Sequence, residues 1–317
     1  MSTDPLLREG YRRAAKLTWQ YGTTYYWGAL LLPRPQRKHV YAVYALCRLA
    51  DDIVDLPNPG EMRPELVEGS SDNSGERLEA FADQFRTALI DRGSDDPVMA
   101  AIVHSVITCG IEPECFDRFF GAMAMDLTTS TYETWADLCG YMEGSAAVIG
   151  EMMLPVLEPL SPEAKAPARS LGLAFQLTNF LRDVDEDLDR GRVYMPQEDL
   201  RHFGVDLSNR TATPEWRAFL AYEIERNRAL YSFADTGIAL LPPRSARCVG
   251  TARVLYAQIL DKIEQRSYDV FSSRARVPTW RKAATAARIM VAGPPRPKRH
   301  AELDGSRNPS HVSSNAQ

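Results

Sequence analysis

Cysteine is scarce in this sequence, with five residues in a chain of 317. No two cysteines form a CxxC pair and no paired histidines lie near them, so neither a zinc site nor a disulfide framework is indicated. Long apolar runs are also missing, and the N-terminal segment MSTDPLLREGYRRAAK lacks the apolar core of a secretory signal. We therefore expect a protein of the reducing cytoplasm, either in solution or peripheral at the inner face of the membrane.

A surplus of basic residues is absent as well, because the formal net charge is -5. Proteins that hold nucleic acid over a broad surface neutralise its phosphates with basic side chains, so no nucleic-acid partner is expected. No GxGxxG motif follows a predicted strand, and a Rossmann nicotinamide site is therefore not indicated. An anionic ligand would have to be bound by local groups.

Strand-like alternation is rare, whereas apolar residues recur at spacings of three and four, the period of a helix. We predict an all-α protein with a single large helical domain over residues 1–290. Two segments rich in Pro, Gly and Ser have too few apolar residues to pack, and we predict a mobile loop at 57–76 and a disordered tail at 291–317. The helical pattern is seen, for example, at Val40, Tyr44 and Cys47.

The segment RKHVYAVYALCRLADDIVD carries a row of polar side chains at steps of four, three and four, which lie on one helix face. Two carboxylates one turn apart repel each other unless a cation lies between them, and oxygen ligands suit a hard cation such as magnesium. A solvated helix end would explain an isolated acidic pair equally well. The row consists of Tyr44, Arg48, Asp51 and Asp55.

The segment FQLTNFLRDVDEDLDRGRVYMP carries a second row, again at helical steps, formed by Gln176, Asn179, Asp183 and Asp187. Arg182 lies on a neighbouring stripe, where its guanidinium could hold a diphosphate oxygen. A solvated helix terminus is the alternative, but apolar residues surround the start of the row, so burial of these polar groups calls for a ligand. The helix should end at Gly191, which leaves Arg190 and Arg192 on a loop near the end of the helix.

Two such rows facing each other across a helical bundle would form a pocket with oxygen ligands on both walls. Magnesium is usually shared between one or two carboxylates and substrate phosphates rather than enclosed by protein alone. The predicted ligand is therefore a diphosphate that binds through the metal.

The two acidic segments resemble those of the squalene and phytoene synthases, above all bacterial phytoene synthases of the actinobacterial type. The similarity covers most of residues 19–280 and includes TTYYWGALLLP, GSAAVIGEMMLPVL and LYAQILDKIEQRSYDVFSSRARV. It implies a helical bundle of the isoprenoid synthase type with a central active-site cavity. It also implies that magnesium, for which manganese could substitute, is bound by Asp51, Asp55, Asn179, Asp183 and Asp187.

The same resemblance assigns substrate contacts. Arg48 and Arg182 would act in catalysis beside the metal-binding acids, and Tyr44 and Gln176 would contact the substrate. Further contacts are implied for three residues whose alternative is a core or surface role, namely Thr24 near a diphosphate, Tyr256 facing the site and Arg274 holding phosphate. Where some relatives carry an aromatic residue this chain has Glu143, and Tyr141 could supply the ring from a neighbouring turn.

The activity implied by the resemblance is the head-to-head condensation of two geranylgeranyl diphosphates to phytoene in carotenoid biosynthesis. It would pass through a cyclopropyl intermediate, prephytoene diphosphate, and NADPH is not expected. A squalene or dehydrosqualene synthase that uses farnesyl diphosphate is the nearest alternative, and an inactive scaffold or assembly protein is a remoter one. Because the product is oily, peripheral membrane contact is a further expectation.

Overall fold

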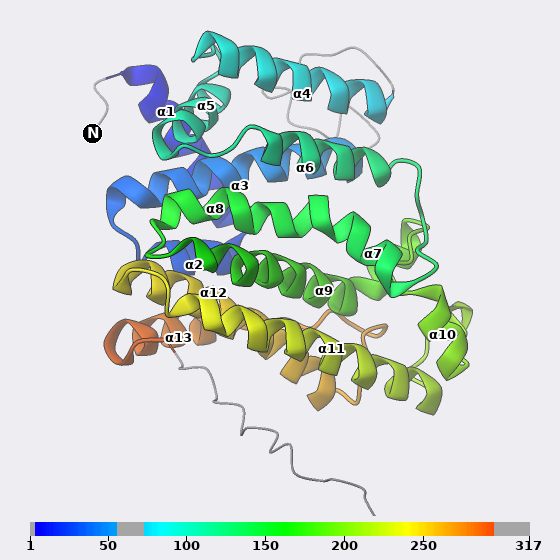
Figure 1. The fold of residues 1–317 in the computed structure, drawn as a ribbon. Helices are drawn as coiled ribbons and strands as arrows, with labels where there is room; N and C mark the ends of the chain where they lie inside the picture. Colours follow the sequence, from blue (N-terminus) through cyan, green and yellow to red (C-terminus); the bar gives the residue numbers. More distant parts are fainter. Residues whose placement is uncertain (1–3, 56–72, 295–317) are drawn as a thin grey trace, which may run out of the picture.

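The computed structural model describes residues 4–55 and 73–294, and within them the chain folds into helices joined by short connections (Figure 1). The only strand-like pairing among these residues is an isolated bridge between Thr131 and Val193. The prediction of an all-α protein is confirmed. The α-helices are α1 (Pro5–Tyr21), α2 (Thr23–Ala29), α3 (Arg34–Asp55), α4 (Ser74–Asp91), α5 (Pro97–Cys109), α6 (Glu114–Met125), α7 (Trp135–Met142), α8 (Val148–Leu157), α9 (Lys165–Asp189), α10 (Gln197–Phe203), α11 (Pro214–Ile238), α12 (Pro243–Gln265) and α13 (Thr279–Ala292), with a π-helical turn η1 (Glu143–Ala147) and short 3-10 turns η2 (Pro162–Ala164) and η3 (Leu207–Asn209).

Helix ends follow from local sequence, as α5 illustrates. Asp96 precedes the helix and its carboxylate accepts a hydrogen bond from the Met99 amide at 2.7 Å, which satisfies one of the free N–H groups of the first turn. Pro97 occupies the first helical position, where its missing N–H is no loss. Gly110 ends the helix with φ of 66°, a left-handed conformation that glycine adopts without strain.

The segments predicted to lack structure lie mostly outside the described residues. The exception in the predicted loop 57–76 is its end, where Asn73 caps α4 by accepting a hydrogen bond from the Gly75 amide at 2.9 Å. Residues 74–76 therefore begin a helix, and the predicted loop was drawn too long at this end. Residues 291–292 likewise complete α13, whereas the tail beyond 294 lies outside the described residues.

Two groups of buried apolar side chains hold the two acidic helices in place. One packs around α3 together with α4, α5 and α6, and the other packs around α9 together with α11 and α12. Burial of each large apolar side chain contributes about 1.5–3 kcal/mol, so each acidic helix has a firm backing on its apolar side. Representative core residues are Leu46, Ile53, Phe85 and Phe116 in the first group and Leu177, Leu181, Phe219 and Ile263 in the second.

The helix α9 lies unusually close to η1 and α8. A Cβ atom built on Gly172 would lie 2.2 Å from the carbonyl oxygen of Ala146, and one built on Gly150 would lie 2.2 Å from that of Ala168. Because only glycine allows this approach, the two helices meet backbone to backbone along this seam. Within residues 4–55 and 73–294, every helix is too short or too polar to cross a bilayer.

Candidate functional site

A cavity of about 920 Å³ lies between α2, α3, α9, α12 and the segment that leads into α13. Every site residue predicted from the sequence lines it, although these residues come from five separate parts of the chain. The structure thus brings the two acidic rows together, while the roles of the individual residues remain predictions. The predicted residues in its lining are Thr24, Tyr44, Arg48, Asp51, Asp55, Gln176, Asn179, Arg182, Asp183, Asp187, Tyr256 and Arg274.

The first acidic wall is the last turn of α3. Burial, reinforced by the charge of Asp55, raises the pKa of Asp51 to about 7. Asp55 is partly neutralised from the facing loop, because its carboxylate accepts a hydrogen bond from Arg192 at 2.8 Å and lies 3.5 Å from the guanidinium of Arg190. The expectation that both arginines follow the end of the second acidic helix is confirmed, because α9 ends at Asp189. Both arginines also line the cavity.

The second acidic wall is the last two turns of α9. Arg182 Nε donates to Asp183 at 2.7 Å, and Arg274 donates to the other oxygen of the same carboxylate at 2.6 Å. Asp187 has no such partner among residues 4–55 and 73–294, and burial together with the charge of Asp183 raises the pKa of Asp187 to about 7. Among the described residues, neither Asp187 nor Asp51 forms an ion pair.

These two walls fit a divalent cation. Besides the unpaired carboxylates, the amide oxygen of Asn179 is buried and has no hydrogen-bond partner among the described residues. Oxygen donors of this kind are those that magnesium prefers. No three His, Cys, Asp or Glu side chains of the described segments are grouped closely enough to hold a metal by themselves. A magnesium ion bound here would also need phosphate oxygens or water.

Arg48 lines the cavity but is engaged differently from the rest of its row. Its guanidinium donates to Asp52, four residues further along α3, and lies 4.4 Å from the ring centre of Tyr21. Asp52, which was not part of the predicted row, is therefore the partner of Arg48. This pairing holds the guanidinium at the cavity rim, where it can reach an anion.

Asp126 is a cavity residue that the sequence reasoning missed. It follows α6, and its carboxylate accepts hydrogen bonds from the hydroxyls of Tyr141 at 2.6 Å and Tyr194 at 3.0 Å. Burial raises the pKa of Asp126. Tyr194 stacks on Phe180 with ring centres 4.1 Å apart, so the hydroxyls are held by aromatic packing. No spacing links these residues in the sequence, and only the tertiary fold unites them.

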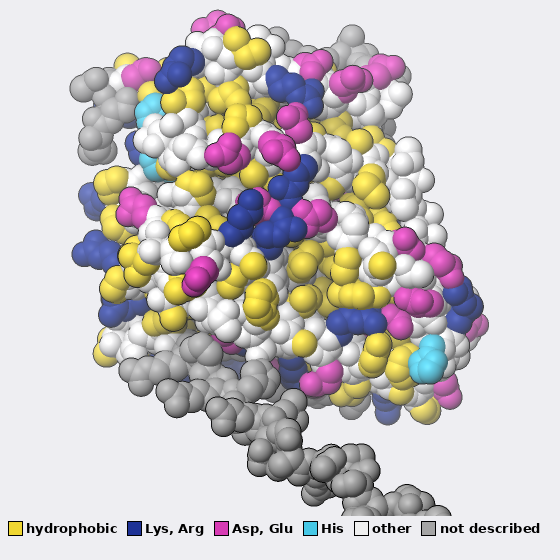
Figure 2. Space-filling model, in the orientation of Figure 1, with side chains coloured by type: hydrophobic (Ala, Val, Ile, Leu, Met, Phe, Trp, Pro, Cys, Tyr) yellow, Lys and Arg dark blue, Asp and Glu magenta, His cyan; other side chains and the backbone are white. Residues whose placement is uncertain are grey.

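Glu143 and Tyr141 point to different sides of the bundle. Tyr141 lines the cavity, as the sequence reasoning allowed, whereas Glu143 pairs with Arg118 and Arg169 outside it. Figure 2 shows basic and acidic side chains gathered over the region of α6, α8 and α9, where Glu151 joins the same network. Glu143 therefore links α6 to α9, and it does not line the cavity in the place of the aromatic residue that some relatives carry at this position.

A group of aromatic side chains, here called the aromatic wall, lies where the polar cavity meets the apolar interior of the protein. Tyr256 stacks on Phe175 with ring centres 4.3 Å apart, and Tyr25 lies 5.6 Å from Tyr256 and 5.7 Å from Tyr44. Burial raises the pKa of Tyr256, so its hydroxyl stays neutral. Tyr25 and Tyr256 of this wall line the polar cavity, and Tyr25 was not singled out from the sequence.

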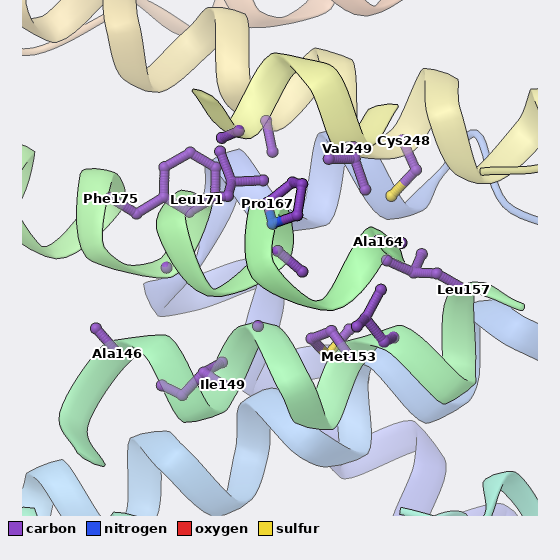
Figure 3. A pocket seen from close by; sticks show the side chains of 18 of the residues that line it. Ala146, Ile149, Met153, Leu157, Ala164, Pro167, Leu171, Phe175, Cys248 and Val249 are labelled. Atoms are coloured by element: carbon purple, nitrogen blue, oxygen red, sulfur yellow. The ribbon is translucent and has the colours of Figure 1, made fainter. Parts of the chain in front are cut away.

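Beyond the aromatic wall lies a second, apolar cavity of about 150 Å³ between α8, α9 and α12 (Figure 3). Its lining runs from Gln176 back along α9 to Ala164, the last residue of η2, a span of about 18 Å at about 1.5 Å per residue. The two cavities adjoin, because six residues line both of them. The shared residues are Tyr25, Val40, Ser145, Ile149, Met153 and Gln176.

Comparison with known proteins gives the same family on several counts. Residues 19–281 match the squalene/phytoene synthase family. The chain is 34% identical to a phytoene synthase of Arthrospira platensis over 298 residues, which cover 89% of this chain and 93% of that protein. It is 36% identical over 282 residues to the chloroplastic phytoene synthase of Daucus carota, covering 86% of this chain and 68% of that protein.

Solved structures agree in fold. A dehydrosqualene synthase with a bound ligand superposes with a TM-score of 0.79 at 26% identity, covering 89% of this chain and 96% of that one. A squalene synthase from Alicyclobacillus acidocaldarius superposes with a TM-score of 0.72 at 29% identity, covering 83% and 96%. The predicted bundle of the isoprenoid synthase type is confirmed, and the chain belongs to the squalene/phytoene synthase family.

Proposed function

We propose that this protein is a magnesium-dependent prenyltransferase that condenses two geranylgeranyl diphosphates head to head to phytoene, a step of carotenoid biosynthesis. The observation that carries the proposal is the junction of two cavities, one lined by facing acidic walls and arginines and the other by apolar side chains. The polar cavity suits diphosphates held through a cation, and the apolar cavity suits isoprenoid chains. The 34% identity to a phytoene synthase supports the same activity.

In this proposal the cation is held by Asp51, Asp55, Asn179, Asp183 and Asp187. Bound magnesium would supply positive charge to the diphosphate as it leaves the allylic carbon. Arg182 and Arg274 already lie together on Asp183, and their remaining N–H groups can donate to phosphate oxygens. Manganese could replace magnesium, and no reductant such as NADPH is required for phytoene.

The aromatic wall has a separate task in the proposal. Loss of the first diphosphate gives an allylic cation, to which the double bond of the second molecule adds, and loss of a proton from the resulting cation closes the ring of the cyclopropyl intermediate. The ring faces of Tyr25, Tyr256 and Phe175 are suited to stabilise nearby positive charge without forming a bond to it. They also exclude water, which would otherwise trap the cation as an alcohol.

Incubation of the purified protein with magnesium and either geranylgeranyl or farnesyl diphosphate tests the proposal, with and without NADPH and with mass spectrometry of the extracted hydrocarbons. A C40 hydrocarbon with a conjugated triene, formed without NADPH, is the expected product. A C30 product from farnesyl diphosphate would instead identify a dehydrosqualene or squalene synthase, the activities named for two of the solved structural relatives. Absence of any product in a folded protein would favour the scaffold alternative.

Matched variants of the second motif separate a metal-binding role from general damage to the helix. Asp183→Asn removes a cavity carboxylate and should abolish turnover. Asp185→Asn changes the same group two residues away, where it pairs with Arg210 outside the cavity, and should retain turnover. Turnover retained by the first variant would contradict the metal assignment.

We further propose that the protein works in the cytoplasm and touches the inner membrane surface, because substrates and product of this kind partition into lipid. Such contact is peripheral in this proposal. It would let the hydrocarbon product leave without crossing water.

A further inference from the structure

The outer face of α13 carries an apolar stripe that no helix of residues 4–55 and 73–294 covers. Trp280, Ala284, Ala287 and Val291 follow at steps of four, three and four, which puts them on one face, and all four are exposed. The exposed fractions of Trp280 and Val291 are 66% and 87%. The opposite face, with Thr285, Ala286 and Ile289, is the buried one.

Helix α13 therefore has apolar side chains on both faces. A surface helix of a soluble protein normally presents polar side chains outward, and exposed apolar stripes of this kind mark contact sites.

The charged residues in and just before α13 are all basic. From residue 270 to 294 the sequence holds five basic residues and no acidic residue, although the whole chain has a net charge of -5. Arg281 and Arg288 are exposed and lie along one side of the apolar stripe, and Arg281 lies 5.2 Å from the ring centre of Trp280. Basic side chains beside exposed tryptophan and aliphatic residues fit the headgroup region of an anionic bilayer, where phosphates meet the acyl chains.

The stripe also adjoins the mouth of the polar cavity. Pro278, Thr279 and Lys282, at the start of α13, line that cavity, and Lys282 donates a hydrogen bond to Thr23 of α2. A bilayer that covers the outer face of α13 would thus lie next to the cavity mouth. An oily ligand could pass between the membrane and the cavity by this route.

We propose that α13 docks this protein on anionic lipid bilayers, with Trp280 and Val291 inserted among the headgroups and Arg281 and Arg288 bound to lipid phosphates. The inference deepens the peripheral membrane contact proposed above by naming its surface and its lipid class. It depends on the exposed face of one helix and not on the chemistry inside the cavity.

Flotation of the purified full-length chain with vesicles of phosphatidylcholine, alone or mixed with phosphatidylglycerol, tests the docking surface. The chain should bind the mixed vesicles more tightly. Arg281→Glu with Arg288→Glu should lower the partition coefficient by more than the roughly fivefold expected for loss of a single basic contact, whereas lysine at both positions should preserve it. Trp280→Ser with Val291→Ser should lower binding by roughly tenfold or more through lost apolar insertion.

A matched control lies on the opposite side of the molecule. Ile90 of α4 is 80% exposed, and Figure 1 shows α4 and α13 at opposite ends of the bundle. Ile90→Ser should leave vesicle binding unchanged. Equal loss in this control, or full binding by the α13 variants, would overturn the proposal. So would binding that disappears only when Arg296, Lys298 and Arg299 of the tail are changed to glutamine.

Turnover in detergent micelles keeps this inference distinct from the proposed activity. The α13 variants should retain wild-type turnover there, because none of the four substituted residues lines the cavity. If vesicle binding follows the expected pattern while the wild-type chain makes no product, the docking surface stands and the enzymatic proposal fails.

Discussion

The length of the apolar cavity should determine which prenyl diphosphate the protein accepts. Ala164, the last residue of η2, is 2% exposed and lines this cavity about 18 Å from Gln176, one of the residues shared with the polar cavity. A phenylalanine at position 164 would fill this end of a cavity of about 150 Å³. The geranylgeranyl chain, which is one isoprene unit longer, should then no longer fit, while the farnesyl chain should still fit.

The expected size of the effect follows from apolar burial. An isoprene unit of about five carbons, at about 0.8 kcal/mol for each buried methylene, is worth about 4 kcal/mol when fully buried. Because the prenyl chain can bend and keep part of its apolar surface buried, the loss of binding free energy should be about 2–3 kcal/mol. This corresponds to a roughly 30- to 150-fold decrease in the ratio of kcat/KM for geranylgeranyl over farnesyl diphosphate. Ala164→Val should give a smaller shift in the same direction.

Steady-state kinetics with both substrates, together with product mass, measures this ratio. Ala88 of α4 is buried but lines neither cavity, so Ala88→Phe reports the effect of overpacking alone and should lower stability without changing the ratio. An unchanged ratio in Ala164→Phe, or an equal loss for both substrates, would refute the idea that this end of the cavity sets chain length.

Three further changes test the packing and titration of the bundle. Gly172→Ala places a Cβ atom against the Ala146 carbonyl and should lower the free energy of unfolding by about 2–4 kcal/mol in urea titrations. Tyr141→Phe removes the hydroxyl that donates to buried Asp126 and should lower this free energy by about 1–2 kcal/mol, with unfolding curves of the same slope. Burial lowers the pKa of His39 from 6.5 to about 4, so its stabilising contribution is complete above pH 6.5 and is lost as pH falls toward 4. The free energy of unfolding should fall between pH 7 and pH 4 by about 3 kcal/mol more in the wild type than in His39→Gln.

The parts of the site that could be predicted are those governed by helix period. Asp51 and Asp55, or Asp183 and Asp187, share a face because steps of three and four are set within one helix, whatever the rest of the chain does. Two such rows in mainly apolar segments also implied that they face each other, since buried carboxylates need a common ligand.

The remaining features depend on contacts between distant segments. Asp126 reaches the cavity from the end of α6 only because Tyr141 and Tyr194 hold it there, and no local pattern encodes that meeting. The apolar cavity is lined largely by apolar residues of α8, α9 and α12, which in the sequence look like ordinary core positions. The start of α4 was missed because Asn73, a single capping residue, ends a segment whose composition otherwise resembles a loop.

The pairing of basic and acidic side chains implies that cation and diphosphate bind cooperatively. Asp183 carries two guanidinium partners, Arg182 and Arg274, so a cation that approaches this carboxylate alone meets positive charge. A diphosphate that takes over those N–H groups would free carboxylate oxygens for the cation and add phosphate ligands of its own.

Each ligand should therefore tighten the other by the same factor, as linkage requires. Titration calorimetry of magnesium with and without inorganic diphosphate measures that factor, after correction for the affinity of the two ligands in solution. We expect a gain of at least fivefold, and Arg274→Gln should reduce it, because this variant leaves Asp183 with a single basic partner. Equal magnesium affinity with and without diphosphate would mean that the arginines on Asp183 serve the fold alone.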